Sequence, residues 1–307
     1  MLSFRSLETR KRICPAWCTF TLAGAGEMGY DVMQKQGNAM SNQQQVPVAE
    51  YTTVQAIFVR QRNCLMLQAD MSPLYVDYYL HLMQHGLRNA ECEDSVVKKL
   101  LAYFTLHLVS RPWQEYHAWT FNTCSPSSAN YFISGSSVDE EVVCRAFTEG
   151  VRETETNMLF AQNLMPNKQP QTSAIILGTG NVESWVEAYY RQSEQRMARA
   201  FELENDRFVL LTAQPGADHD WLEALSTEDA RLICETEQHK LLETRKFYFR
   251  CGCTLDKILP IIRAMRSSVA DQLSEQGYVE ASCPRCGACY KVTADMLTGG
   301  AEPDSPQ

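Results

Sequence analysis

The chain of 307 residues lacks several features that would place it in a common functional class. It has no run of about 18 apolar residues, so the sequence predicts no transmembrane helix. It also lacks an excess of positive charge, because 28 lysines and arginines stand against 37 acidic residues and the net charge is −9. That balance disfavours binding to nucleic acid or to an anionic membrane. No nucleotide-binding glycine loop and no Ser-His-Asp or Cys-His catalytic signature can be recognised.

Cysteine, in contrast, is abundant, with twelve residues. The first seven of these are scattered along the chain rather than grouped. Scattered cysteines fit buried free thiols in a reducing compartment, such as the cytoplasm, better than a disulfide framework. They are Cys14, Cys18, Cys64, Cys92, Cys124, Cys144 and Cys234.

The remaining cysteines cluster near the C-terminus. Cys251 and Cys253 flank one glycine, and after 29 further residues Cys283 and Cys286 form a CxxC pair. Two close pairs of thiols with a foldable segment between them have the spacing of a zinc site, in which four thiolates bind Zn²⁺ tetrahedrally at about 2.3 Å. If the thiolates are oxidised, each can form a disulfide with its near neighbour and release the metal. Cys289 makes a second CxxC with Cys286, so spacing alone leaves open whether it replaces a ligand or joins a disulfide.

These motifs resemble those of the heat-shock protein 33 family, which are redox-regulated holdase chaperones. The likeness rests on the CxC pair, the CxxCG pair and the tyrosine that follows them, Tyr290. Two upstream stretches agree in order and separation, Tyr189–Gln195 and Phe208–Ala217. The sequence departs from the family where Met197 and Ala198 replace the usual proline and threonine, and the glycine-rich strand turns of the family's first half are largely missing.

The resemblance implies a function and a ligand set. Cys251, Cys253, Cys283 and Cys286 would hold one Zn²⁺ per chain in the reduced protein, with Cys289 left out. Oxidation to Cys251–Cys253 and Cys283–Cys286 disulfides would release zinc and unfold the C-terminal domain. The protein would then bind unfolding client proteins without ATP during oxidative stress, as a homodimer and not as an enzyme. Two other readings stay open: a constitutive zinc-ribbon interaction module without redox switching, and a thiol-disulfide oxidoreductase.

The sequence predicts an α+β fold with a helical linker and a small zinc-binding domain. We expect a poorly ordered extension over 1–45, an α+β chaperone core over 46–216, a mainly helical, redox-sensitive linker over 217–250 and a zinc-binding redox-switch domain over 251–307. The basic and then apolar start of the chain also fits a signal or transit peptide, and Met40 would make a natural later start.

Hydrophobic periodicity predicts the elements of the core. A hairpin is expected from 51 to 67, closed by Pro73, then helices over 76–87 and 94–108. On the first helix Val76, Tyr79, Leu80, Met83 and Leu87 share one face, and on the second Val97, Leu100, Leu101, Phe104 and Leu108 do. Strands are expected at 119–121, 131–134, 142–147, 174–177 and 208–212, and a helix at 182–197.

In the C-terminal domain Thr254 is expected to cap a helix that Pro260 kinks or divides, and Gly277 to stop its continuation. Two short strands, 278–282 and 290–293, should flank the CxxC turn. Arg250, Arg285 and Lys291 are placed to offset the charge of four thiolates. His81 and His85 are four residues apart on a predicted helix, and we interpret them as a structural pair rather than a metal site.

Overall fold

The computed structural model describes residues 51–298, except 112–114, 126, 152–153 and 166–167. The predictions for the N-terminal extension and the last nine residues lie outside the described residues. Within the described range the chain forms two compact units, 51–251 and 252–298, which are taken separately below. Among the described helices, none is long and apolar enough to cross a membrane.

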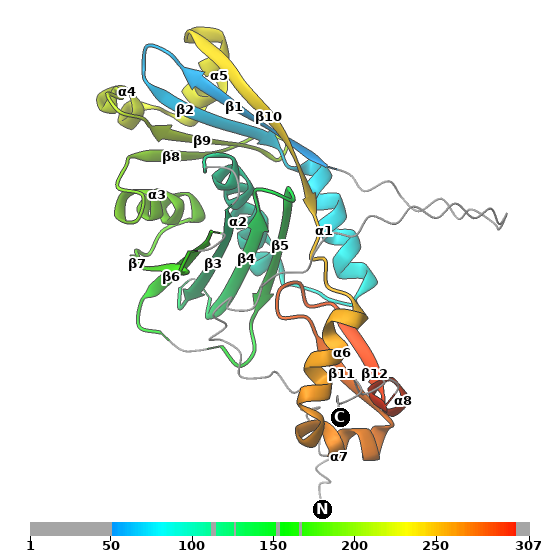
Figure 1. Cartoon of the computed structure of the whole chain (residues 1–307). Coiled ribbons are helices and arrows are strands. Elements are labelled where there is room, and N and C mark those ends of the chain that lie inside the picture. Colours follow the sequence, from blue (N-terminus) through cyan, green and yellow to red (C-terminus); the bar gives the residue numbers. More distant parts are fainter. Residues whose placement is uncertain (1–50, 112–114, 126, 152–153, 166–167, 299–307) are drawn as a thin grey trace, which may run out of the picture. The chain divides into compact units, whose positions relative to one another are not determined.

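The larger unit is built on a ten-stranded sheet in the order β7-β6-β3-β4-β5-β10-β1-β2-β9-β8 (Figure 1). Neighbours are antiparallel except β5 and β10, which are parallel. The sheet therefore has two antiparallel halves that meet at β5 and β10. The strands are β1 (Thr52–Val59), β2 (Cys64–Asp70), β3 (Tyr116–Thr123), β4 (Ala129–Ser136), β5 (Glu141–Phe147), β6 (Asn157–Leu164), β7 (Gln171–Leu177), β8 (Ala198–Leu203), β9 (Arg207–Ala213) and β10 (His239–Phe249).

Helix α2 (Glu91–Val109) packs against strands of both halves. Its predicted apolar stripe is confirmed, because Val97, Leu100, Leu101, Phe104 and Leu108 are all buried. Helix α3 (Val182–Gln192) begins after Asn181, whose side chain accepts a hydrogen bond from the Ser184 N–H, and packs against β7 and β8. The predicted hairpin, the predicted core strands and these two helices are present, but the helix predicted over 182–197 ends at Gln192. Strands β6 and β8 were not predicted.

The predicted apolar face of the first helix is wrong. Helix α1 spans Ser72–Gln84, and Pro73 lies in its first turn instead of closing the hairpin. Its buried residues are Leu74, Tyr75 and Tyr78, whereas Met83 is 77% exposed. The helix is apolar on nearly every side, so periodicity could not choose the buried face. The two tyrosines can be buried because Tyr75 Oη donates to the Lys98 carbonyl and Tyr78 Oη to Asp94.

The expectation of a mainly helical segment over 217–250 is wrong for its second half. Helices α4 (His219–Ala224) and α5 (Thr227–Thr236) are followed by strand β10, in the middle of the sheet (Figure 1). Leu241 and Leu242, which suggested a helix face, are about half exposed. Arg245, Phe247 and Phe249 are buried instead, with the period of two of a strand. Pairing with β1 along its length decides the conformation of this segment.

Helices α4 and α5 cover one face of the sheet at strands β1, β2, β9 and β8. Leu222 and Ile233 of these helices share a hydrophobic cluster with Ile57, Met66 and Leu211 of the strands. Alternate strand residues point to the opposite face, where Phe208 meets Tyr103 of α2 with ring centroids 5.3 Å apart. The strands β2 and β9 are thus covered on both faces, which explains why they are so apolar.

The smaller unit contains α6 (Leu255–Ala264), α7 (Arg266–Gln276), the hairpin β11 (Tyr278–Ser282) and β12 (Cys289–Thr293), and α8 (Ala294–Thr298). The predicted cap is confirmed, because Thr254 accepts a hydrogen bond from the Lys257 N–H. Pro260 lies inside α6, and the break between α6 and α7 falls later, at Met265. Gly277 ends α7 in the left-handed conformation, as predicted.

Candidate metal centre

The CxxC turn between β11 and β12 positions two of the candidate ligands. The Gly287 N–H donates to the Cys283 carbonyl at 2.9 Å, and the Cys283 N–H donates to the Ala288 carbonyl at 2.8 Å. Gly287 has a φ of +79°, a conformation that residues with a Cβ rarely adopt, so glycine after the second cysteine is what closes this turn. Cys283 and Cys286 are buried, with 4% and 1% of their surface exposed.

The four predicted cysteines come together in space. The Sγ atoms of Cys251, Cys253, Cys283 and Cys286 all lie within 4.8 Å of one another, and Cys253 Sγ is 3.5 Å from Cys286 Sγ. None of the four is in a disulfide. Four sulfurs at about 2.3 Å from a tetrahedral zinc ion would stand about 3.8 Å apart, so this spacing fits a thiolate-bound metal. Cys289 is exposed and outside this group.

Tyr290 is a close neighbour of the cluster that the sequence motif contained but did not explain. Its hydroxyl donates to the Cys253 carbonyl at 3.0 Å and lies 3.2 Å from the Cys253 Sγ. Burial raises the pKa of this phenol, and the hydrogen bond to Cys253 and the negative thiolates raise it further. Tyr290 therefore stays protonated and can orient the first cysteine pair, as outer-shell groups do in metal sites.

A positive charge close to the first cysteine pair, that of Lys257, was also not predicted. Lys257 Nζ donates to the Gly252 carbonyl at 2.7 Å. Two of the residues expected to offset the thiolate charge have other partners: Arg250 lies 3.8 Å from Glu141, and Lys291 lies over the ring of Tyr278. The position of Lys257 could have been predicted from the sequence. It is three residues after the helix cap Thr254, which places its side chain on the same side of the helix as the cap and the CxC pair before it.

The other described cysteines do not form a second group. Cys64 and Cys144 are buried, and burial raises the pKa of the Cys64 thiol to about 11 and that of Cys144 further. Cys92 and Cys124 are exposed, so the expectation of buried free thiols holds only for some of them. Among the described residues, the cluster near the C-terminus is the one place where four such ligands meet.

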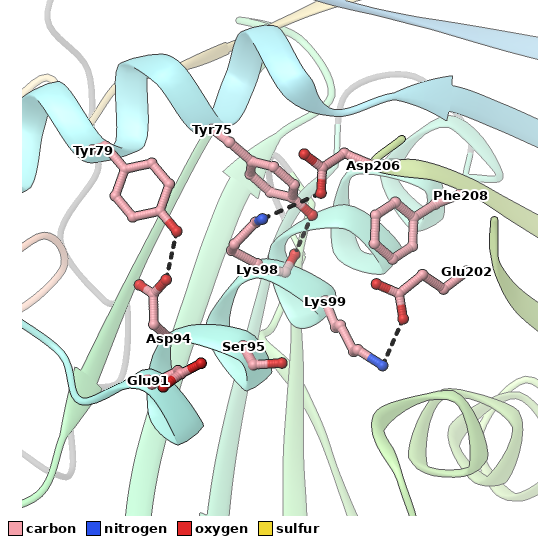
Figure 2. A pocket seen from close by; sticks show the side chains of 10 residues that line it. All are labelled: Tyr75, Tyr79, Glu91, Asp94, Ser95, Lys98, Lys99, Glu202, Asp206 and Phe208. Atoms are coloured by element: carbon pink, nitrogen blue, oxygen red, sulfur yellow. Dashed lines mark hydrogen bonds and ion pairs between the residues drawn. The ribbon is translucent and has the colours of Figure 1, made fainter. Parts of the chain in front are cut away.

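A pocket in the larger unit is lined by charged residues, but these do not form a cluster of metal ligands like that of the four cysteines (Figure 2). It has a volume of about 180 Å³ between α1, α2 and the β8–β9 turn. Its lysines are already paired, Lys98 with Asp206 at 3.2 Å and Lys99 with Glu202 at 2.7 Å, and the Tyr79 hydroxyl donates to Asp94 at 2.5 Å. These pairs tie the elements together. Nearby, His81 packs on His85 and on Phe249, and their role as a structural pair stays a prediction.

The stretch of the chain that carries the four clustered thiols is similar to a known family of proteins. Residues 202–293 match the family model described as Hsp33 protein. This stretch runs from the end of β8 to β12 and includes all four clustered cysteines. The resemblance to the heat-shock protein 33 family is therefore confirmed.

Two relatives agree. The 33 kDa chaperonin of Nitrosococcus oceani is 26% identical over 145 residues, which are 40% of this chain and 50% of that protein. The chain thus spans about half the length of the curated relative it matches. The crystal structure of the 33 kDa chaperonin, a heat shock protein 33 homologue, from Thermotoga maritima superposes with a TM-score of 0.62 at 13% identity, over 81% of this chain and 97% of that one. That likeness confirms the α+β fold.

Proposed function

We propose that this protein is a redox-regulated, ATP-independent holdase chaperone whose switch is the four-cysteine cluster. Cys251, Cys253, Cys283 and Cys286 would hold one Zn²⁺ in the reduced, resting protein. The observation that carries the proposal is the approach of all four sulfurs within 4.8 Å, in a stretch that matches the Hsp33 family model. Bound Zn²⁺ would supply four metal–thiolate bonds that keep the sulfurs deprotonated and cross-link the two cysteine pairs.

The size of the smaller unit explains why this cross-link would act as a switch. Residues 252–298 form short helices and one two-stranded hairpin, and no residue of α6 is fully buried. Such a unit is near the lower size limit for a self-supporting fold. Structural zinc contributes about 10–16 kcal/mol of apparent binding energy in small modules, against about 5–15 kcal/mol for the stability of an ordinary domain. Without the cross-link, the unit is expected to unfold.

The redox step is the oxidation of thiols to disulfides. For each pair, two cysteine thiols and one hydrogen peroxide give one disulfide and two water molecules, so two electrons pass from sulfur to the peroxide. The pairs proposed from the family resemblance are Cys251–Cys253 and Cys283–Cys286. A disulfide sulfur has lost its thiolate charge and is a poor ligand for a metal ion. Hypochlorous acid is a second oxidant of the same class.

The partners follow from this activity. The oxidised protein would bind unfolded or partly folded client proteins, as a homodimer, and release them when its disulfides are reduced. A switch that rests in the thiolate form requires a reducing compartment, and we propose the cytoplasm. Binding of clients without chemical conversion makes the protein a non-enzyme.

Aggregation of a heat-denatured client protein tests the proposal. We expect little protection by the reduced chain and strong protection after peroxide treatment, together with the loss of four thiols and the release of one zinc ion per chain. The variant Cys289→Ser is the matched control, because Cys289 is exposed and outside the cluster, and it should switch normally. Equal protection in both states with zinc retained would contradict the switch and favour a constitutive zinc-ribbon module.

A further inference from the structure

The ten strands of the larger unit are joined unevenly. Antiparallel neighbours are paired over six to eight residues each. In contrast, β5 and β10 are paired at two positions, Tyr248 with Glu141 and Phe249 with Val142. This pairing is also parallel, which is slightly less stable per residue. The junction between the two half-sheets is therefore the weakest line in the sheet (Figure 1).

A small set of contacts holds this junction, which we call the seam and define as residues 137–142 and 245–250. The Tyr248 N–H donates to the Glu140 carbonyl at 2.9 Å, and the Arg250 N–H donates to the Val142 carbonyl at 3.0 Å. Arg245, whose side chain is 2% exposed, donates from Nε to Glu140 Oε1 at 3.0 Å and also to the Ser137 carbonyl. Helices α2 and α3 bridge the two halves as well, so an open seam does not divide the unit.

The seam adjoins the proposed switch along the chain. Arg250, its last residue, is followed directly by Cys251. Helix α5 lies at the opposite end of β10, and eight residue pairs between β10 and β1 stand between them. A change of conformation that starts at Cys251 therefore reaches the seam before it can reach α5.

Helices α4 and α5 also have their own attachments. Leu222 and Ile233 are fully buried against the strands, and Arg199 donates to the carbonyls of Leu222 and Leu225 at the end of α4. None of these groups belongs to the seam or to the cysteine cluster. The helical pair is thus expected to stay in place after the end of β10 has come free.

We propose that the seam is the element through which oxidation of the cysteine cluster acts on the larger unit. Disorder that begins at Cys251 releases Tyr248–Arg250 from β5 and opens the sheet between its two halves, before α4 and α5 detach. The inference rests on the proposed function, since it takes oxidation of the cluster as the trigger, and it adds the place where the trigger acts. Opening frees the strand edges of β5 and β10 and separates Arg245 from Glu140.

Hydrogen–deuterium exchange of the full-length chain, reduced and after peroxide treatment, tests the proposal. We expect amides of 137–147 and 245–250 to exchange at least about tenfold faster after oxidation, at times when 227–236 is still unchanged. Earlier loss of protection in 219–236 would overturn the inference. So would a seam that stays protected while 252–298 exchanges freely.

A variant of the seam gives a second test. Glu140→Gln keeps the size of the side chain but removes the charge that Arg245 meets. We expect faster exchange at the seam in the reduced protein and activation at a lower peroxide dose, with unchanged zinc content. Glu228→Gln is the matched control, because Glu228 forms an exposed pair with Arg231 within α5 and should change neither quantity. If Glu140→Gln does not fold, hydrogen–deuterium exchange of the unaltered chain before and after oxidation still decides whether the seam opens first.

The client assay separates this inference from the proposed function. A seam that opens in oxidised protein with no protection of a client would support the inference and contradict the chaperone proposal. Protection of a client by oxidised protein in which the seam stays closed would support the chaperone proposal and contradict the inference about the seam.

Discussion

Tyr290 and the four clustered cysteines show how much of the site is set by single side chains. The cysteines supply soft ligands, the glycine at 287 closes the turn between two of them, and the tyrosine hydroxyl reaches the backbone and sulfur of Cys253. Because these contacts are made by single side chains, they can be tested by conservative substitutions.

Cys253→Ser should abolish tight zinc binding. A serine hydroxyl is a much poorer ligand than a thiolate, and the sulfur of Cys253 is 3.5 Å from that of Cys286 in the cluster. We expect loss of stoichiometric zinc and of the folded signal of 252–298, measured by metal analysis and by hydrogen exchange. Cys289→Ser should retain both. Full zinc content in the first variant would show that the cluster is not the metal site.

Tyr290→Phe should weaken the site without destroying it. The change removes one hydrogen bond to Cys253, and outer-shell partners of this kind are worth about 10–100-fold in metal affinity. Competition with a chelator should therefore show faster zinc loss, with the fold retained. Tyr278→Phe is a suitable control, because that ring meets Lys291 through its face rather than its hydroxyl. Equal chelator resistance in both variants would remove Tyr290 from the site.

At the scale of elements, the α4–α5 pair is fastened to the β1–β2 turn by one side chain. Arg62 contacts Asp218, the cap of α4, at 2.7 Å and Glu237, just after α5, at 2.9 Å. It also lies over the ring of Trp221, 5.1 Å from the centroid. One arginine thus holds both ends of the helical segment on the sheet.

Arg62→Met should loosen the helical pair while keeping the apolar stem of the side chain. The groups involved are partly exposed, and such pairs are worth about 0–1 kcal/mol each, so we expect a total loss near 1 kcal/mol. Hydrogen exchange in 219–236 should rise several-fold. Arg231→Met, which breaks an exposed pair within α5, is the control and should leave exchange unchanged. No difference between the two variants would show that Arg62 does not help to hold α4 and α5 on the sheet.

At the scale of the whole molecule, the core of the larger unit contains two buried histidines. His107 Nδ1 lies 2.9 Å from the Tyr190 hydroxyl, and His117 Nε2 lies 2.8 Å from Glu115, with the two rings 5.0 Å apart. Burial lowers the pKa of His107, and the nearby His117, Arg111 and Arg196 lower it further. Burial also lowers the pKa of His117, although the hydrogen bond to Glu115 opposes it.

Acid should therefore destabilise the larger unit. Because the folded state has the lower pKa, the unfolded chain binds protons first as pH falls below about 6.5. The two neutral histidines make their full contribution to the free energy of unfolding above that pH. Below it, the free energy of unfolding should decline by up to about 1.4 kcal/mol per pH unit for each histidine. Urea unfolding between pH 7.5 and 5 measures the slope, and His107→Gln should reduce it. An unchanged stability down to pH 5 would contradict the assignment of neutral buried imidazoles.

Much of this molecule was predictable because its signals are local. The spacing of the four cysteines, the cap at Thr254, the stop at Gly277 and the apolar stripe of α2 each depend on residues close in sequence. Where local signals were ambiguous, prediction failed. Helix α1 is apolar on most sides, and its buried face was chosen by tyrosine hydroxyls that find partners on α2.

The sequence by itself indicated that four thiols would meet, because two closely spaced cysteine pairs stand on either side of a foldable segment. The tertiary structure alone decided that residues 239–249 form a central strand, because only pairing with β1 supplies the hydrogen bonds that outweigh a helical alternative. It also decided that this strand ends on β5 at two residues beside Cys251. Contacts between segments about a hundred residues apart leave no pattern in the local sequence, so the junction of β5 and β10 could be identified only from the tertiary structure.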